Sequence, residues 1–179
     1  MSDMWTDHAQ DPRTHGNPVG EKATLKQYLD NYRLTLQMKC EGLDAEQLAR
    51  RSVPPSTLSL LGLVRHLAQV EHHWFRRVLQ GHRDEPWLFI RDGDRDADFG
   101  GAVGEDEVVE EAFAALRAQI AEADAWFLAL EEADLGREVP HHDRVVSIRD
   151  VLVHMIEEYA RHCGHADLLR ECIDGRTGQ

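Results

Sequence analysis

The sequence has little of what secreted, membrane or disulfide-stabilised proteins require. Its three cysteines, Cys40, Cys163 and Cys172, are an odd and sparse set, so we expect free thiols in a reducing, cytoplasmic environment. No apolar run approaches the roughly 20 residues that are needed to span a bilayer. The first 20 residues lack both a basic start and an apolar stretch, and we therefore do not expect a signal peptide.

Basic residues are also scarce relative to acidic ones. The chain has 20 Lys and Arg against 33 Asp and Glu, which gives a formal net charge of -13. Nucleic acids and anionic membrane surfaces attract clusters of Lys and Arg, so we expect neither as a partner. A negative chain with 11 histidines instead favours a cationic ligand such as a metal ion.

The chain divides by polarity into a short leader and one body. Residues 1–19 are polar and contain Pro and Gly, and we predict a mobile leader that could become ordered against the body or a partner. Residues 20–179 are long enough to form a single domain with a hydrophobic core.

Apolar residues that recur every three to four positions predict four long amphipathic helices. They span about residues 21–42, 58–79, 105–130 and 147–172, with a short helix at 45–51. Asp44, Ser147 and either Ser56 or Thr57 are the expected N-caps. Residues 131–146 form a polar connection without an alternating strand pattern. Four helices of similar length favour an all-α four-helix bundle.

Residues 81–104 form a long connection of a kind that is usually functional or disordered in compact domains. The apolar stretch Trp87–Ile90 argues against full disorder. The acidic run DGDRDADFG lacks the glutamate and the spacing of an EF-hand. We predict that this run is solvated, with a calcium site as the weaker alternative.

The last predicted helix places a carboxylate and an imidazole on its apolar face. At about 100° per residue, His162 falls between Met155 and Val151 on that face, and Glu158 lies beside it. Burial of an unpaired carboxylate is unfavourable, and a metal ion shared by residues i and i+4 would remove the penalty. His66, on the apolar face of the second long helix, can supply a third ligand.

Two histidines and one carboxylate leave coordination positions open, as in catalytic sites. Zinc, nickel, manganese and ferrous iron all accept such a ligand set. Spacing alone leaves other interpretations open, because Glu158 and His162 could instead form a buried ion pair. His154 and His165, at the edge of the apolar face, could be alternative ligands or could orient the other two.

The remaining candidates are predicted to be structural or exposed. Cys163 points away from His162 along the helix and is expected to be structural. The other histidines are expected at the surface: His8, His15, His72, His73, His82, His141 and His142.

Two segments carry a family resemblance. LLGLVRHLAQVEHHWFRRVL resembles the first metal-ligand helix of the DinB superfamily, and SIRDVLVHMIEEYARHCGHADLLRECIDGRTG resembles the closing helix of its mycothiol S-transferase branch. The resemblance covers about residues 24–178. It implies a DinB-like up-down-down-up four-helix bundle with a long crossover connection, and homodimers are common among such proteins. It also implies a divalent metal, zinc above all, on the triad His66, Glu158 and His162.

The activity implied by the resemblance is a metal-dependent transfer of mycothiol, or a related thiol, onto electrophilic small molecules. No catalytic residue is predicted beyond the metal ligands. Alternatives are an isomerase or hydrolase that uses the same site, a metal-binding stress or detoxification protein without catalysis, and a helical interaction module without metal. Trp74, Tyr159 and the 81–104 connection are candidate pocket walls. Three arginines are candidate contacts for an anionic part of the thiol: Arg65, Arg149 and Arg170.

Overall fold

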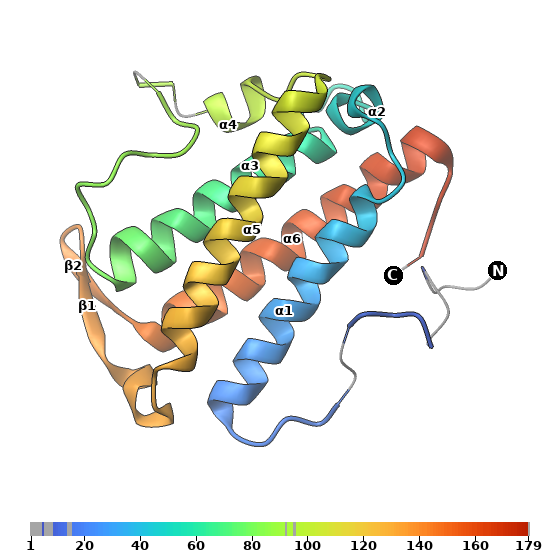
Figure 1. Ribbon diagram of the computed structural model, residues 1–179. Coiled ribbons are helices and arrows are strands. Elements are labelled where there is room, and N and C mark those ends of the chain that lie inside the picture. The colour runs from blue at the N-terminus through green and yellow to red at the C-terminus, as the bar shows by residue number, and fades with distance from the viewer. Residues whose placement is uncertain (1–4, 6–8, 14–15, 92, 95, 179) are drawn as a thin grey trace.

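Four long helices form the body of the protein in the computed structural model, which describes residues 5, 9–13, 16–91, 93–94 and 96–178. They are α1 (Glu21–Cys40), α3 (Leu60–Glu71), α5 (Asp106–Leu128) and α6 (Ile148–Asp174), and a π-helix, η1 (His72–Leu79), continues α3. Helices α1 and α6 run one way, and α3 and α5 run the other way (Figure 1). The connection from η1 returns along the bundle to the start of α5. The predicted up-down-down-up bundle with a long crossover is therefore confirmed.

Shorter elements join the long helices. They are α2 (Ala45–Ala49), α4 (Ala97–Gly100), the 3-10 helix η2 (Glu132–Gly136), β1 (Glu138–His141) and β2 (Arg144–Ser147). Strands β1 and β2 pair antiparallel, with Glu138 opposite Ser147. The prediction that residues 131–146 contain no strand was wrong. Four-residue strands are too short for alternation to stand out, and the turn depends on His142 at a positive φ of 53°.

Side-chain caps set where the helices begin. The predicted caps Asp44 and Ser147 both form capping boxes, with Gln47 and Asp150 respectively. The second long helix begins two residues later than predicted, because the hydroxyl of Ser59 accepts from the N–H of Gly62 at 3.1 Å. Neither Ser56 nor Thr57 caps this helix.

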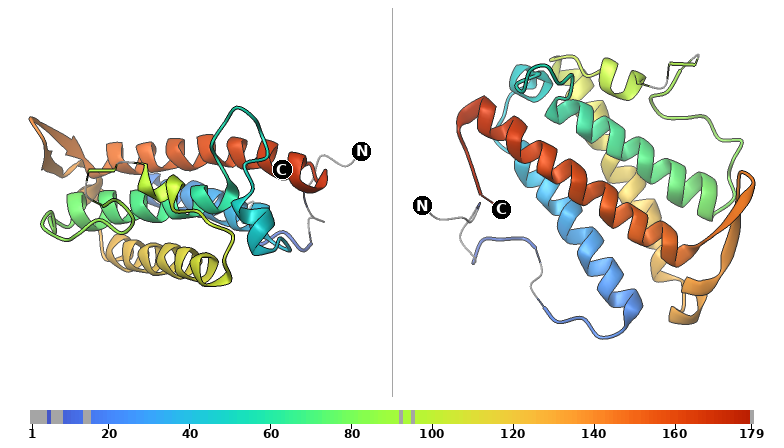
Figure 2. Two further views of the ribbon diagram at one scale, coloured as in Figure 1. Left: turned by 90° about the horizontal axis from the view of Figure 1, so that it is seen from above. Right: turned by 180° about the vertical axis from the view of Figure 1, so that it is seen from behind.

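The core lies where the four helices meet. Helices α3 and α6 lie side by side on one face of the bundle, and α1 and α5 lie on the other (Figure 2). Each long helix contributes side chains that are almost inaccessible to solvent, among them Leu29, Leu36, Leu63, Leu67, Leu116 and Met155. Burial of this apolar surface is the main force that holds the helices together.

A buried polar network joins all four helices inside this core. The guanidinium of Arg33 on α1 donates to both carboxylate oxygens of Glu71 on α3, at 2.7 and 2.8 Å. The hydroxyl of Tyr159 on α6 donates to Glu71 at 2.9 Å, and Arg33 also reaches Asp124 on α5 at 2.8 Å. Burial, and then the neighbouring Glu71, raise the pKa of Tyr159 well above its usual range. These hydrogen bonds are directional and form only when the helices are correctly aligned. They therefore fix how α3 and α6 are rotated relative to each other.

The described part of the leader contacts the body. Trp5 is buried, and its ring lies under the amino group of Lys39 at 4.0 Å and the guanidinium of Arg176 at 3.7 Å. Arg176 also donates to the carbonyl oxygen of Trp5 at 3.0 Å. Residues 1–4, 6–8 and 14–15 of the leader lie outside the described residues, and the division at residue 19 stays a prediction. Over the described ranges, no helix combines the length and apolar character needed to cross a bilayer.

Candidate metal centre

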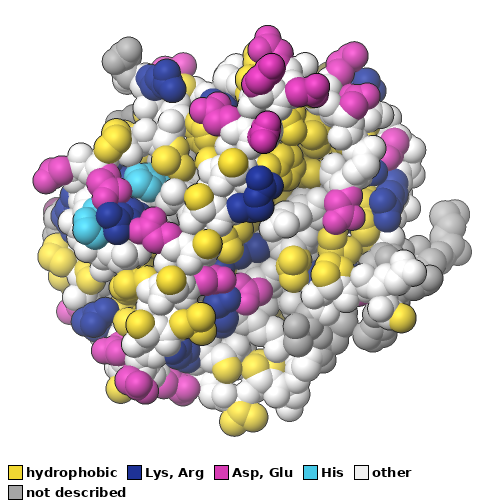
Figure 3. Space-filling model, viewed as in Figure 1, with side chains coloured by type: hydrophobic (Ala, Val, Ile, Leu, Met, Phe, Trp, Pro, Cys, Tyr) yellow, Lys and Arg dark blue, Asp and Glu magenta, His cyan; other side chains and the backbone are white. Residues whose placement is uncertain are grey.

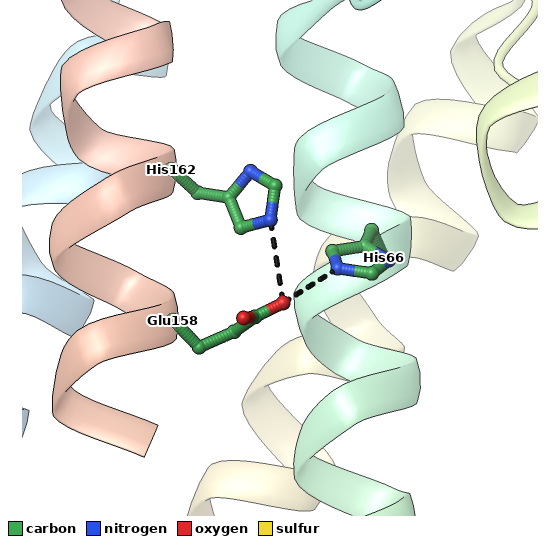
Figure 4. Close-up of side chains that lie close together, drawn as sticks. All are labelled: His66, Glu158 and His162. Carbon is green, nitrogen blue, oxygen red and sulfur yellow. Dashed lines mark hydrogen bonds and ion pairs between the residues drawn. The ribbon is translucent and has the colours of Figure 1, made fainter. Parts of the chain in front are cut away.

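Three side chains converge between α3 and α6. His66 projects from α3, while Glu158 and His162 project from successive turns of α6 (Figure 4). Oε1 of Glu158 lies 3.0 Å from Nε2 of His66 and 3.4 Å from Nε2 of His162. The three potential ligand atoms all lie within 4.8 Å of one another. One ion could therefore contact all three after small side-chain adjustments.

Packing of α6 directs Glu158 and His162 towards the contact between α6 and α3. Met155, Tyr159 and Ala166 on α6 are fully buried, which turns the face that carries Glu158 and His162 towards α3. The hydrogen bond from Tyr159 to Glu71 then joins α6 to α3 at the residue next to Glu158. The sequence pattern predicted this face, and the structure brings the three predicted residues together.

Asp98 is a residue of this site that the sequence analysis missed. Its Oδ2 lies 2.8 Å from Nδ1 of His66, and its Oδ1 accepts from the N–H of Phe99 at 2.9 Å. The ring of Phe99 stacks on the imidazole of His66 with centroids 4.7 Å apart. A carboxylate on Nδ1 holds the imidazole in the tautomer that leaves Nε2 free to bind a metal.

The prediction that the acidic run is solvated was wrong for Asp98, which is buried. Nε of Arg65 donates to the backbone carbonyl of Asp98 at 2.8 Å and holds α4 against α3. A Cβ on Gly101 would lie 2.7 Å from the Arg65 guanidinium, so glycine permits this close approach. A single Asp–Phe pair in a polar run gives too weak a periodic signal to predict such burial.

The electrostatics of the triad favour an ionised carboxylate. Burial disfavours the charged form of His66, but hydrogen bonds to Asp98 and Glu158 outweigh it and raise the pKa of His66 to about 9. Hydrogen bonds from His162 and His66 hold the pKa of Glu158 far below its usual range. Glu158 is therefore ionised and His66 protonated in this ion pair, and a metal ion that bound here would displace the proton from Nε2 of His66.

The donor set fits a divalent transition metal. Two imidazole nitrogens and one carboxylate oxygen are ligands that zinc accepts, and three protein ligands leave a position for an external molecule. The side chains are 20%, 19% and 10% exposed for His66, Glu158 and His162, so the site is protected but accessible.

The alternative histidine ligands lie outside the triad. Within the described part of the chain, His66, Glu158 and His162 form the group of this kind that could hold a metal. His154 packs against the ring of Trp74, with centroids 5.0 Å apart. Nδ1 of His165 lies 3.3 Å from Nδ1 of His162, a position from which it can orient that ring.

Several other candidates have structural partners instead. Tyr159 is fully buried and donates its hydroxyl to Glu71, so it cannot line an open pocket. Arg65 is held against α4, and Arg149 pairs with Glu21 at the surface. Arg170 is buried and donates to backbone carbonyls at the end of α1.

Three histidines predicted at the surface are not exposed, and His141 is half-buried like His73. His72 is buried, and its two ring nitrogens lie 3.1 Å from the side-chain oxygen of Gln119 and 3.0 Å from the carbonyl oxygen of Pro86. His73 is half-buried, and its ring stacks on Trp87. The long connection folds back over η1 and covers His72 and His73, which a local pattern does not reveal. His8 and His15 lie outside the described residues.

His73 is expected to make stability depend on pH. Burial, followed by cationic neighbours, lowers the pKa of His73 to about 4. As the pH falls, His73 is protonated at a higher pH in the unfolded chain than in the folded protein. The free energy of unfolding therefore has its full value above about pH 6.5 and decreases as the pH falls towards 4. The free energy of unfolding of the unsubstituted protein should fall between pH 7.5 and pH 4.5. In His73→Gln this fall should be smaller by about 1–2 kcal/mol, a value that allows for the partial exposure of His73.

Urea unfolding at the two pH values measures this difference. His82→Gln, at an exposed position, is the matched control and should follow the unsubstituted protein. Equal pH dependence in His73→Gln and the unsubstituted protein would contradict the expectation.

Comparisons with known proteins agree with this architecture. The sequence pattern of the family described as mycothiol-S-transferase matches residues 24–175. A crystal structure of a conserved protein from Enterococcus faecalis has the same fold, with a TM-score of 0.62 and 16% identity over 89% of this chain and 99% of that one. No curated protein matches the chain. The family match spans most of the chain, and the chain therefore belongs to the DinB-like mycothiol-S-transferase family.

Proposed function

We propose that His66, Glu158 and His162 bind one divalent metal ion, zinc by preference. We further propose that the protein uses it to transfer mycothiol, or a related small thiol, to electrophilic small molecules. The observation that carries the metal site is the convergence of three ligand atoms within 4.8 Å, backed by the buried carboxylate of Asp98. The family match supports the choice of thiol.

The chemistry requires a thiolate near neutral pH. A bound divalent cation lowers the pKa of a thiol that coordinates it, and thereby supplies the nucleophile. The sulfur then forms a bond to the electrophilic carbon, the leaving group departs with its electron pair, and the thiol proton passes to solvent.

The chain's own residues would hold this site in one geometry. Asp98 orients His66 through Nδ1, and the ring of Phe99 covers one face of that imidazole and keeps water from it. His165 contacts the far nitrogen of His162. Each histidine of the triad therefore has a second contact that restricts the rotation of its ring.

Location and assembly are part of the same proposal. All three cysteines are free thiols, and two of them are buried, which supports the expectation of a reducing cytoplasm. A homodimer is the assembly we expect from the family.

The test combines metal analysis with a conjugation assay. We expect protein purified without a nickel column to contain about one metal ion per chain by elemental analysis. With mycothiol and monobromobimane, the holoprotein should form the thiol–bimane conjugate faster than the spontaneous reaction, by at least about 100-fold at saturating protein, because nucleophile activation and positioning both contribute. His66→Ala and metal-depleted protein should both fall to the spontaneous rate.

The outcomes separate the alternatives. A bound metal with a rate no faster than that of His66→Ala would support a metal-binding protein without transferase activity. Less than about 0.1 metal ion per chain, with no uptake of added zinc, would leave a buried ion pair in a helical module and end the metal proposal.

A further inference from the structure

A second hollow lies along the bundle from the triad, between η1, the connection that follows it and the β1–β2 turn. It encloses about 840 Å³, which is the size of a small-molecule site. Its polar lining consists of two arginines, three histidines and a tryptophan, which are Arg77, Arg83, His73, His141, His142 and Trp87. Among the described residues, no Asp or Glu lines it.

The charge in the hollow comes from the guanidinium groups of Arg77 and Arg83, in a chain whose formal net charge is -13. Burial, followed by His141 and Arg77, lowers the pKa of His73 to about 4, so its imidazole is neutral near pH 7. The pKa of His141 is lowered in the same way, by burial and then by His142 and Arg144. Figure 3 shows that acidic side chains are spread over much of the visible face, with Lys and Arg side chains between them. An anion that entered the hollow would meet favourable charge.

Trp87 packs against one cationic and one neutral side chain of the hollow. The guanidinium of Arg77 lies 4.3 Å from its ring centroid, and the imidazole of His73 stacks on the same ring at 5.1 Å with an interplanar angle of 24°. In the described structure, Nε of Arg77 and Nδ1 of His73 are buried without a hydrogen-bond partner. Such groups are uncommon, and they leave hydrogen-bonding capacity for a ligand.

The neighbouring Arg76 shows the contrast. Its guanidinium is paired with Glu85, at 2.9 Å from Nε, and with Glu122 at 2.8 Å. Arg77, one residue later in the π-helix, has its guanidinium on the tryptophan and lines the hollow. Substitution of Arg76 is therefore a matched control for substitution of Arg77, because Arg76 is paired with carboxylates and Arg77 has no carboxylate partner among the described residues.

The hollow and the triad lie at different levels of the same continuous helix, α3 and η1. His73 lies seven residues after His66, which corresponds to about 10 Å along a helix axis. The ring of Trp74 contacts His141, which lines the hollow, at 4.9 Å, and His154 at 5.0 Å. His154 precedes Glu158 by one turn of α6. The distance from cationic hollow to triad is therefore about the length of a small organic molecule.

We propose that this hollow binds the carboxylate end of an electrophilic organic acid and directs its reactive carbon towards the triad. The assignment rests on the proposed thiol transfer and names its substrate class. A planar carboxylate can accept two hydrogen bonds from one guanidinium, which suits Arg77 better than it suits a lysine. The apolar body of the acid would lie along Trp74.

Binding of a carboxylate probe tests the hollow without any catalysis. We expect isothermal titration calorimetry at low ionic strength to detect saturable binding of benzoate, with benzamide and inorganic phosphate bound more weakly. Arg77→Gln should weaken benzoate binding by about tenfold or more, and Arg76→Gln should leave it unchanged. Benzamide bound as tightly as benzoate, or an unaffected Arg77→Gln, would overturn the proposal. Tighter binding of phosphate would overturn the choice of a carboxylate.

A conjugation assay tests the link to the triad. Mycothiol displaces bromide from 4-(bromomethyl)benzoate and from its neutral methyl ester, so sulfur–carbon bonds form and bromide leaves in both. We expect the ratio of kcat/KM for acid over ester to fall about tenfold in Arg77→Gln but not in Arg76→Gln. An unchanged ratio would overturn the substrate assignment. Arg77-dependent benzoate binding without any conjugation would retain the anion site and count against the proposed transferase function instead.

Discussion

Replacement of Glu158 by alanine is expected to lower the affinity for zinc by more than about 100-fold, because it removes the charged ligand of the triad. Glu158 contacts both histidines, and it supplies the carboxylate of the group that could hold a metal among the described residues. Competition titration with a chromophoric zinc chelator measures the affinity. Circular dichroism of the variant checks that the bundle is intact.

Asp98→Asn should have an intermediate effect and His154→Ala almost none. Loss of the charge on the carboxylate behind His66 is expected to weaken zinc binding by about 10–100-fold while leaving all three ligands present. His154 packs on Trp74, so its removal should leave zinc affinity within about twofold. If His154→Ala lost the metal and Glu158→Ala kept it, the ligand assignment would be wrong.

Glu71→Ala is expected to destabilise the bundle by about 3–5 kcal/mol. The substitution leaves the guanidinium of Arg33 and the hydroxyl of Tyr159 buried without their shared acceptor. Urea unfolding of metal-depleted protein gives the free energy of unfolding without a contribution from zinc binding.

Two comparisons separate this effect from a general loss of charge. Glu157→Ala breaks an exposed pair with Arg161 and should change the free energy of unfolding by less than about 0.5 kcal/mol. The triple variant Arg33→Met, Glu71→Leu, Tyr159→Phe should recover much of the stability, because it removes the ion pair and the buried hydroxyl that donates to Glu71. A loss below about 1 kcal/mol in Glu71→Ala would show that the network contributes little to folding.

The sequence by itself determined the helical bundle and the face of α6 on which Glu158 and His162 lie. Helical periodicity depends only on neighbours along one chain segment, so the apolar face that carries Glu158 and His162 could be predicted directly. Capping by Asp44 and Ser147 is likewise local, and both caps were predicted correctly. The third ligand, His66, needed the packing of α3 against α6, which periodicity made possible and the family resemblance strengthened.

The tertiary structure alone decided what surrounds these ligands. Asp98 becomes a partner of His66 because α4 folds back on α3, a contact between residues 32 positions apart in a polar run. Glu71, Arg33 and Tyr159 sit on three different helices, and no local pattern reveals that they share one network. The cationic hollow likewise combines η1 with the β1–β2 turn, far along the chain. Periodicity determines which face of a helix is buried, but only packing determines which side chains meet there.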